Sequence, residues 1–88
     1  MIDETLLREA AATVAANGPG DAALDALRRR WPDVRFTVCA DDDVPARLAP
    51  AWSGVRFNLY LIGGGEHCLA LTRDHDTAIG IVVATVAD

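Results

Sequence analysis

The first 31 residues carry apolar side chains at the three- and four-residue spacing of an α-helix. This pattern predicts two helices, over residues 3–16 and 21–31, separated by the helix-ending segment NGPG. Asp3 and Asp21 stand at the two predicted starts, where a carboxylate can accept a hydrogen bond from an exposed backbone N–H. Each helix is amphipathic and therefore needs an apolar partner surface.

The rest of the chain alternates apolar and polar residues, as β-strands do. Strands are predicted over residues 34–40, 55–62, 67–72 and 78–86. The first two strands place these residues on one apolar face: Val34, Phe36, Val38, Ala40, Val55, Phe57, Leu59 and Leu61. The order of elements predicts a single α+β domain over residues 1–88, with two N-terminal helices packed on one face of a four-stranded, mostly antiparallel sheet.

The last three strands are predicted to form a meander with three-residue loops at Gly63–Gly65 and Asp74–Asp76. This arrangement sets Leu61 opposite His67. A slip of one residue would turn the apolar side chains of a strand to the other face, which favours this register over a four-residue loop. The direction of the first strand relative to its neighbour, parallel or antiparallel, stays open.

Two short helices cover one side of such a sheet, so its second face is predicted to serve self-association or to bind a ligand. Small and apolar residues of this face combine with an acidic run that follows the first strand. The interaction surface predicted from them contains Asp41, Asp42, Asp43, Asn58, Tyr60, Cys68, Ala70 and Val82.

Composition narrows the class of protein. A hydrophobic fraction of 51% excludes a disordered chain, and no apolar run approaches the roughly 20 residues that span a bilayer. The start of the chain is acidic where a signal peptide is basic, so we expect a cytoplasmic protein. A net charge of −5 argues against non-specific nucleic-acid binding. The one basic run, RRR at 28–30, falls at a predicted helix C-terminus, where cations oppose the helix dipole.

The histidines and cysteines are candidates for a metal or redox site. His67 and His75 lie at opposite ends of one predicted strand, roughly 20 Å or more apart, so they cannot share a metal. His75 is predicted to be an exposed turn residue, and His67 to be hydrogen-bonded at the edge of the core. Cys39 and Cys68 are predicted to be small buried thiols on the second face, able to approach each other if the first strand runs parallel to the second, with residues 41–54 as the crossover. A metal- or redox-responsive protein using Cys39, Cys68 and His67 is the alternative interpretation.

The acidic run Asp41–Asp43 lacks the alternating ligands and the glycine of a calcium loop. Asp42 or Asp43 is predicted to cap a short helix through VPARLA, with ion binding and a docking surface as the alternatives. The lone serine, Ser53, has no G-x-S-x-G context, and GGG at 63–65 lies between strands, unlike a phosphate loop. We therefore expect neither an enzyme nor a protein with a cofactor.

The segments CADDDVPARLAP (39–50) and FNLYLIGGGEHCLALTRD (57–74) resemble a family of small uncharacterised proteins from nitrogen-fixing bacteria. The likeness runs from about Pro32 to the C-terminus. It implies an accessory or regulatory protein connected with nitrogen fixation or its redox and metal metabolism, and it transfers no activity. Together with the second face, it predicts a small interaction module that binds a second copy or another protein, with no nucleic acid or membrane as partner.

Overall fold

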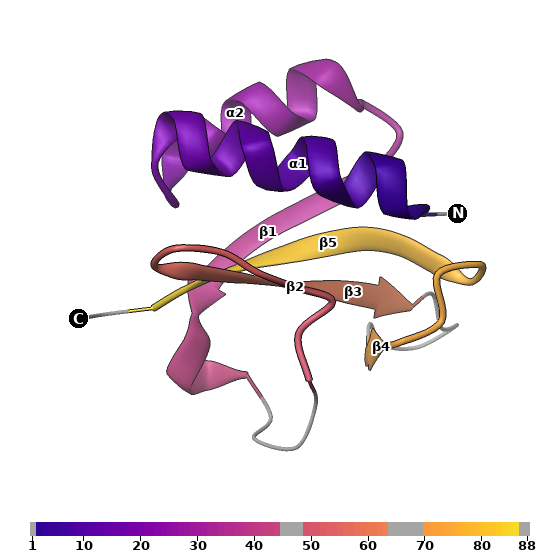
Figure 1. The fold of residues 1–88 in the computed structure, drawn as a ribbon. Helices are drawn as coiled ribbons and strands as arrows, with labels where there is room; N and C mark the ends of the chain where they lie inside the picture. The colour runs from indigo at the N-terminus through magenta and orange to yellow at the C-terminus, as the bar shows by residue number, and fades with distance from the viewer. Residues whose placement is uncertain (1, 45–48, 64–69, 87–88) are drawn as a thin grey trace.

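The computed structural model describes residues 2–44, 49–63 and 70–86, in which two helices lie side by side over one face of a β-sheet (Figure 1). The described elements are α1 (Glu4–Asn17), α2 (Asp21–Arg30), β1 (Arg35–Ala40), the 3₁₀ turn η1 (Asp41–Asp43), β2 (Trp52–Ser53), β3 (Phe57–Gly63), β4 (Ala70–Thr72) and β5 (Ala78–Thr85). The predicted α+β class is confirmed, with five strands in the described sheet in place of four. No helix in this part of the chain has the length and apolar character needed to cross a membrane.

The two helices begin in different ways. The Asp3 side chain accepts a hydrogen bond from the backbone N–H of Leu6 at 2.7 Å, as predicted for the cap of α1. The predicted cap of α2 is wrong, because Gly20 holds the capping position without a side-chain bond and Asp21 is already the first helical residue. Asp21 still lies in the first turn, where its charge opposes the positive end of the helix dipole.

The sheet has the strand order β1-β5-β3-β2, and β4 also pairs with β3. β1 pairs with β5 instead of with the strand that follows it in sequence, and it runs parallel to β5. Because β3 runs antiparallel to β5, β1 and β3 run in opposite directions. The predicted meander is wrong, because β5 follows β4 in sequence but pairs with β3 and β1. The two long strands β3 and β5 are apolar on both sides and occupy the centre of the sheet, as strands buried on both faces do.

The register at β4 also differs from the prediction. Leu61 lies opposite Thr72 instead of His67, and Gly63 pairs with Ala70 instead of beginning a three-residue loop. The part of the predicted strand 67–72 before Ala70 lies outside the described residues.

The predicted strand 55–62 starts too early, because a tight turn precedes β3, which begins at Phe57. Val55 is 85% exposed instead of facing the core. Arg56 has a φ of 67°, which breaks the extended conformation, and the N–H of Gly54 donates to the carbonyl of Phe57 at 2.8 Å. The turn joins β3 to β2, a two-residue strand that the sequence did not predict.

The main core lies between the helices and the sheet. Its buried side chains are Ile2, Leu7, Ala10, Ala11, Val14, Ala23, Leu27, Phe36, Phe57, Leu59, Leu61, Ala78, Ile81 and Val83. Of the residues predicted on the apolar face of the first two strands, four are buried in this core: Phe36, Phe57, Leu59 and Leu61. Val34 and Val38 are half-buried against it, whereas Ala40 and Val55 are exposed, contrary to the prediction. Ala78 points into this core and Ile79 is 41% exposed because the pairing of β3 with β5 shifts between Ile62 and Gly63.

Candidate interaction site

Three polar side chains meet at the end of β1 and form what we call the Asp41 cluster. Asp41 Oδ1 accepts one hydrogen bond from Asn58 Nδ2 and one from the hydroxyl of Tyr60, both at 3.0 Å. Asn58 and Tyr60 are two residues apart on β3, so they lie on the same face of the sheet. Since β5 lies between β1 and β3, the carboxylate ties these two strands together across β5.

The surroundings of Tyr60 in this cluster favour the protonated form of its phenol. Its side chain is 5% exposed, and this burial raises the pKa of the phenol. The hydrogen bond to Asp41 and the negative charge of that carboxylate raise the pKa further, whereas the bond with Asn58 lowers it. The phenol is therefore protonated at neutral pH and donates a hydrogen bond to Asp41. The arrangement serves to hold one carboxylate in place.

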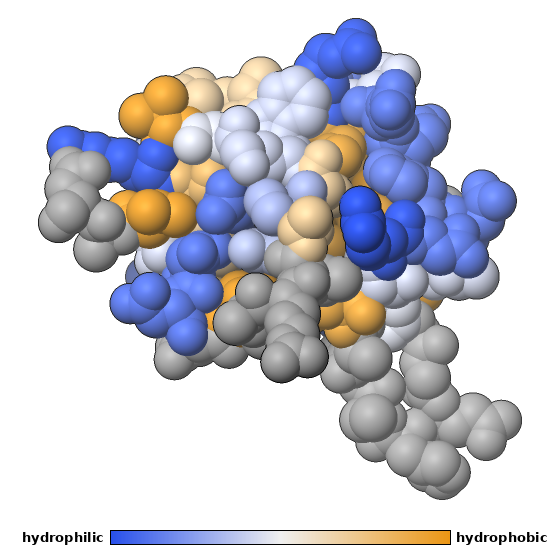
Figure 2. All heavy atoms as spheres, turned by 60° about the horizontal axis from the view of Figure 1, so that its bottom comes forward, coloured by the Kyte–Doolittle hydropathy of each residue, from blue (hydrophilic) through white to orange (hydrophobic). Residues whose placement is uncertain are grey.

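A small apolar cluster underlies these polar groups on the second face of the sheet. Tyr60, Ile62, Val82 and Ala84 are buried there, and Cys39, Val44 and Leu71 pack against them. Figure 2 brings this side forward and shows apolar side chains in small patches separated by polar ones. The second face, which we predicted to be open, is thus already covered in a single chain. Among the described residues of this face, Tyr60, Val82 and Ala84 are buried within the chain, so they do not present an apolar surface to a second copy.

A hollow beside the Asp41 cluster forms an acidic pocket of about 220 Å³. Its described lining consists of Ala40, Asp41, Asp42, Thr85 and Val86. Asp42 is exposed and Val86 is 38% exposed, so both charge and apolar surface are accessible. A pocket with carboxylates and short apolar walls suits the head group and the methylene stem of an arginine or lysine side chain.

The acidic run Asp41–Asp43 forms the 3₁₀ turn η1, whereas Asp42 or Asp43 was predicted to cap a short helix. Asp42 and Asp43 lie inside this turn, whose N-cap is Ala40, and Val44 is extended with φ −79° and ψ 137°. They do not cap a helix that begins at Val44. An extended conformation is the one expected of a residue before proline. Of the rest of the predicted helix, residues 45–48 lie outside the described part of the chain, and Ala49 is not helical.

The residues predicted for a metal or redox site are not brought together in what the structure describes. His67 and Cys68 lie outside it, while Cys39 is half-buried and packs against the second-face cluster. Among residues 2–44, 49–63 and 70–86, no three His, Cys, Asp or Glu side chains are grouped so that they could hold a metal ion.

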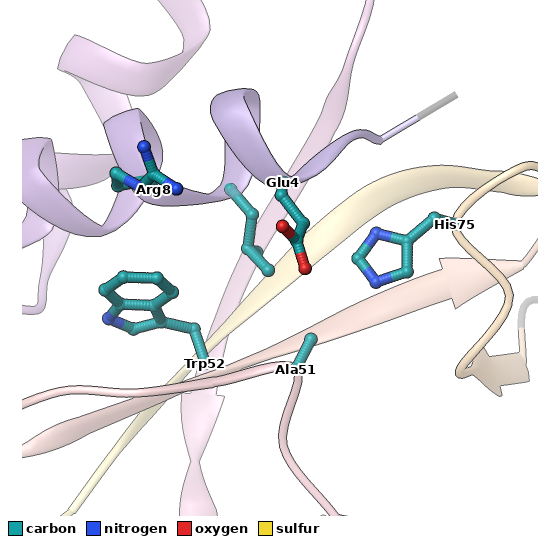
Figure 3. Close-up of a pocket in the computed structure, with 6 residues that line it drawn as sticks. Glu4, Arg8, Ala51, Trp52 and His75 are labelled. Atoms are coloured by element: carbon teal, nitrogen blue, oxygen red, sulfur yellow. The ribbon is translucent and has the colours of Figure 1, made fainter.

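A second pocket lies between α1 and β2 and contains a residue that sequence reasoning misjudged. It has a volume of about 150 Å³ and is lined by Glu4, Leu7, Arg8, Ala51, Trp52 and His75. In Figure 3 the Glu4 carboxylate points toward the imidazole of His75, and Arg8 lies above the indole of Trp52. We predicted that His75 is exposed, but it is half-buried and its Nδ1 lies 2.6 Å from the carbonyl oxygen of Ile2. Ile2 is 73 positions away, so no local pattern could indicate this contact.

The family model of DUF6129, a family of unknown function, matches residues 9–86. The chain belongs to this family. No curated protein and no solved structure matches it significantly. The matched stretch contains the whole Asp41 cluster. Of the six residues that line the second pocket, Glu4, Leu7 and Arg8 precede this stretch, and the other three lie within it.

The predicted interaction surface divides into distinct parts in this DUF6129 protein. Asp41, Asn58 and Tyr60 are joined by hydrogen bonds, and Asp42 lines the acidic pocket beside them. Val82 is buried under the cluster. Ala70 pairs with Gly63 at the far end of β3, and Cys68 lies outside the described residues. The polar members near η1 are therefore the ones that form a site.

Proposed function

We propose that this DUF6129 protein is a small interaction module with an accessory or regulatory role. Its acidic pocket receives an arginine or lysine side chain of a partner protein. The observation that carries the proposal is the Asp41 carboxylate, held by two 3.0 Å hydrogen bonds at the wall of a pocket that Asp42 also lines.

Pre-organisation is the physical reason for choosing this pocket. A carboxylate that is already fixed loses little conformational freedom when a cation binds, so more of the interaction energy remains for affinity. The overall charge of −5 also attracts a basic partner over a distance and speeds its association at low salt. A single exposed ion pair contributes little, so a partner needs further contacts, for which the exposed side chain of Val86 is available.

The proposal is tested by titrating the ¹⁵N-labelled protein with a short arginine-rich peptide and following backbone amide shifts. We expect shifts at Ala40, Asp42 and Val86 that weaken as salt is added. Asp42→Asn should reduce the affinity by about threefold or more, because it removes one exposed charge.

Asp25→Asn is the matched control, since Asp25 is an exposed carboxylate on α2, in the layer that covers the other face of the sheet. It should leave the affinity within error of the wild type. Equal losses in both variants, or shifts spread evenly over all acidic residues, would show general charge attraction and contradict a pocket.

Two further expectations remain predictions. The connection with nitrogen fixation rests on the resemblance of the segments 39–50 and 57–74 alone. The metal- or redox-responsive alternative depends on His67 and Cys68, which lie outside the described residues.

A further inference from the structure

Strand β1 forms one edge of the described sheet, with β5 as its neighbour. Its six residues run from Arg35 to Ala40, and Arg35, Thr37 and Ala40 are exposed. An edge strand presents a row of backbone N–H and C=O groups that can pair with another chain. This edge adjoins the acidic pocket, and Asp41, which follows β1 and lines the pocket, belongs to both.

Three observations show which backbone groups of β1 point outward. The carbonyl of Arg35 lies against Gly80 of β5, and the carbonyl of Cys39 accepts a hydrogen bond from Thr85 Oγ1 at 3.3 Å. The carbonyl of Phe36 instead accepts a 3.3 Å bond from Arg28 on the other side. Because successive residues of a strand direct their backbone groups to opposite sides, Phe36 and the alternate residues after it face outward.

The charges at the two ends of β1 are opposite. Arg35 begins the strand, and Asp41–Asp43 follow its end. Two copies of β1 in antiparallel orientation place the arginine of each beside the carboxylates of the other, whereas parallel pairing would bring like charges together. Charge complementarity thus selects a second copy of this chain in one orientation.

We propose that two copies of the protein pair antiparallel through β1, with Val38 on the two-fold axis. In this register Phe36 faces Ala40 of the second copy, so every outward-facing residue of the strand joins the ladder. Arg35 then lies opposite Asp41, and Thr37 lies opposite Cys39. The sheets of the two copies become continuous.

Pairing of the two β1 strands breaks one weak hydrogen bond, from Arg28 to the carbonyl of Phe36, and buries a small area. The Arg28 side chain leaves the carbonyl of Phe36, which then accepts the N–H of Ala40 from the second copy. Arg28 is exposed and its bond is long at 3.3 Å, so little is lost. A single edge buries less surface than a standard interface, and we expect a dissociation constant on the order of 100 µM.

A designed disulfide tests the register. Residues 37 and 39 face each other as a non-hydrogen-bonded pair, whose Cα atoms are about 4.5 Å apart, within the range of a disulfide. Thr37→Cys, made together with Cys68→Ser, should therefore give a covalent dimer through Cys39 under mild oxidation. Adding Cys39→Ser should abolish the dimer band on a non-reducing gel. A band that persists in that variant, or no band in the first, would overturn the proposal.

A proline at the edge tests the pairing itself. Ala40 is exposed and has a φ of −78°, which suits proline, and its N–H faces outward. Ala40→Pro should keep the monomer folded, by circular dichroism, and abolish the dimer in sedimentation velocity. Ala40→Ser retains the N–H and should dimerise like the wild type. A wild type that stays monomeric at millimolar concentration would contradict the proposal, and so would an Ala40→Pro variant that still dimerises.

A charge reversal completes the test. Arg35→Asp should weaken the dimer at least threefold, whereas Arg29→Asp, an equally exposed reversal on α2, should not. Equal effects of the two would point to net charge instead of the pair with Asp41 and would contradict the register. Peptide binding at the acidic pocket is measured at low micromolar protein, where the chain is monomeric, so either proposal can fail without the other.

Discussion

At the scale of single residues, Tyr60 reports on the site more directly than any other side chain. It is the only tyrosine in the sequence, and its hydroxyl donates to Asp41. Burial and the Asp41 carboxylate both raise its pKa above the ordinary value of about 10. The neutral phenol therefore stabilises the folded state fully below pH of about 10, and this contribution is lost as the pH rises through the higher folded pKa.

The substitution Asp41→Asn should lower the pKa of Tyr60, because it removes the negative charge next to the phenol. Alkaline titration followed by phenolate absorbance measures this shift, and the signal comes from Tyr60 alone because the sequence has no other tyrosine. Asp42→Asn is the control, since the hydroxyl of Tyr60 donates its hydrogen bond to Asp41. Coincident titration curves for the wild type and Asp41→Asn would show that the carboxylate does not act on Tyr60.

The Asp41 cluster was partly predictable from its residues. Strand alternation placed Asn58 and Tyr60 on one face, and Asp41 was included in the predicted surface as part of the acidic run that follows the first strand. The hydrogen bonds themselves were not predictable, since they join positions 17 and 19 residues apart and depend on β5 lying between β1 and β3. The burial of the second-face cluster was not predicted, because Val44 and Leu71, which pack against it, come from distant parts of the chain that no local pattern brings together.

At the scale of secondary-structure elements, the two helix starts give a matched comparison. Both begin with an aspartate in the sequence, but only Asp3 accepts a backbone hydrogen bond as a cap. Asp3→Ala should therefore destabilise the protein by about 1 kcal/mol, the usual contribution of an N-cap. Asp21→Ala should cost a few tenths of a kcal/mol, because it removes only a favourable charge from the first turn.

Urea unfolding of both variants measures the difference. The slope of the transition should stay constant, so that a change in midpoint reports stability alone. A loss for Asp21→Ala as large as that for Asp3→Ala would contradict the assignment of Gly20 as the cap of α2.

At the scale of the whole molecule, local patterns predicted the elements but not their pairing. Helical period and strand alternation identify which face of each element is buried, and these faces agree with the observed core except at the strand ends Ala40 and Val55, which are exposed. Which strands become neighbours depends on contacts between distant residues, and a meander satisfies the same alternation as the observed order. Two such contacts between distant parts of the chain are seen here: β1 pairs with β5, and the backbone N–H of Ile2 donates to the carbonyl of His75 at 3.0 Å.

The pairing of β1 with β5 depends on Gly80. An added Cβ at this position would collide with the carbonyl oxygen of Arg35, a backbone atom that cannot rotate away as a side chain would. Gly80→Ala should therefore push β1 away from β5 and lower the free energy of unfolding by about 2–3 kcal/mol. Gly20→Ala is the control, because its added Cβ meets nothing within 4 Å, and it should cost less than about 1 kcal/mol.

A second readout separates this cause from a general loss of packing. β1 leads directly into Asp41, so a displaced β1 should lengthen the bond between Asp41 and Tyr60. The pKa of Tyr60 in folded Gly80→Ala should then move back toward its ordinary value, while Gly20→Ala leaves it unchanged. If Gly80→Ala has wild-type stability and the same titration curve, β1 does not approach β5 as closely as the structure shows, because a close approach leaves no room for the extra methyl group.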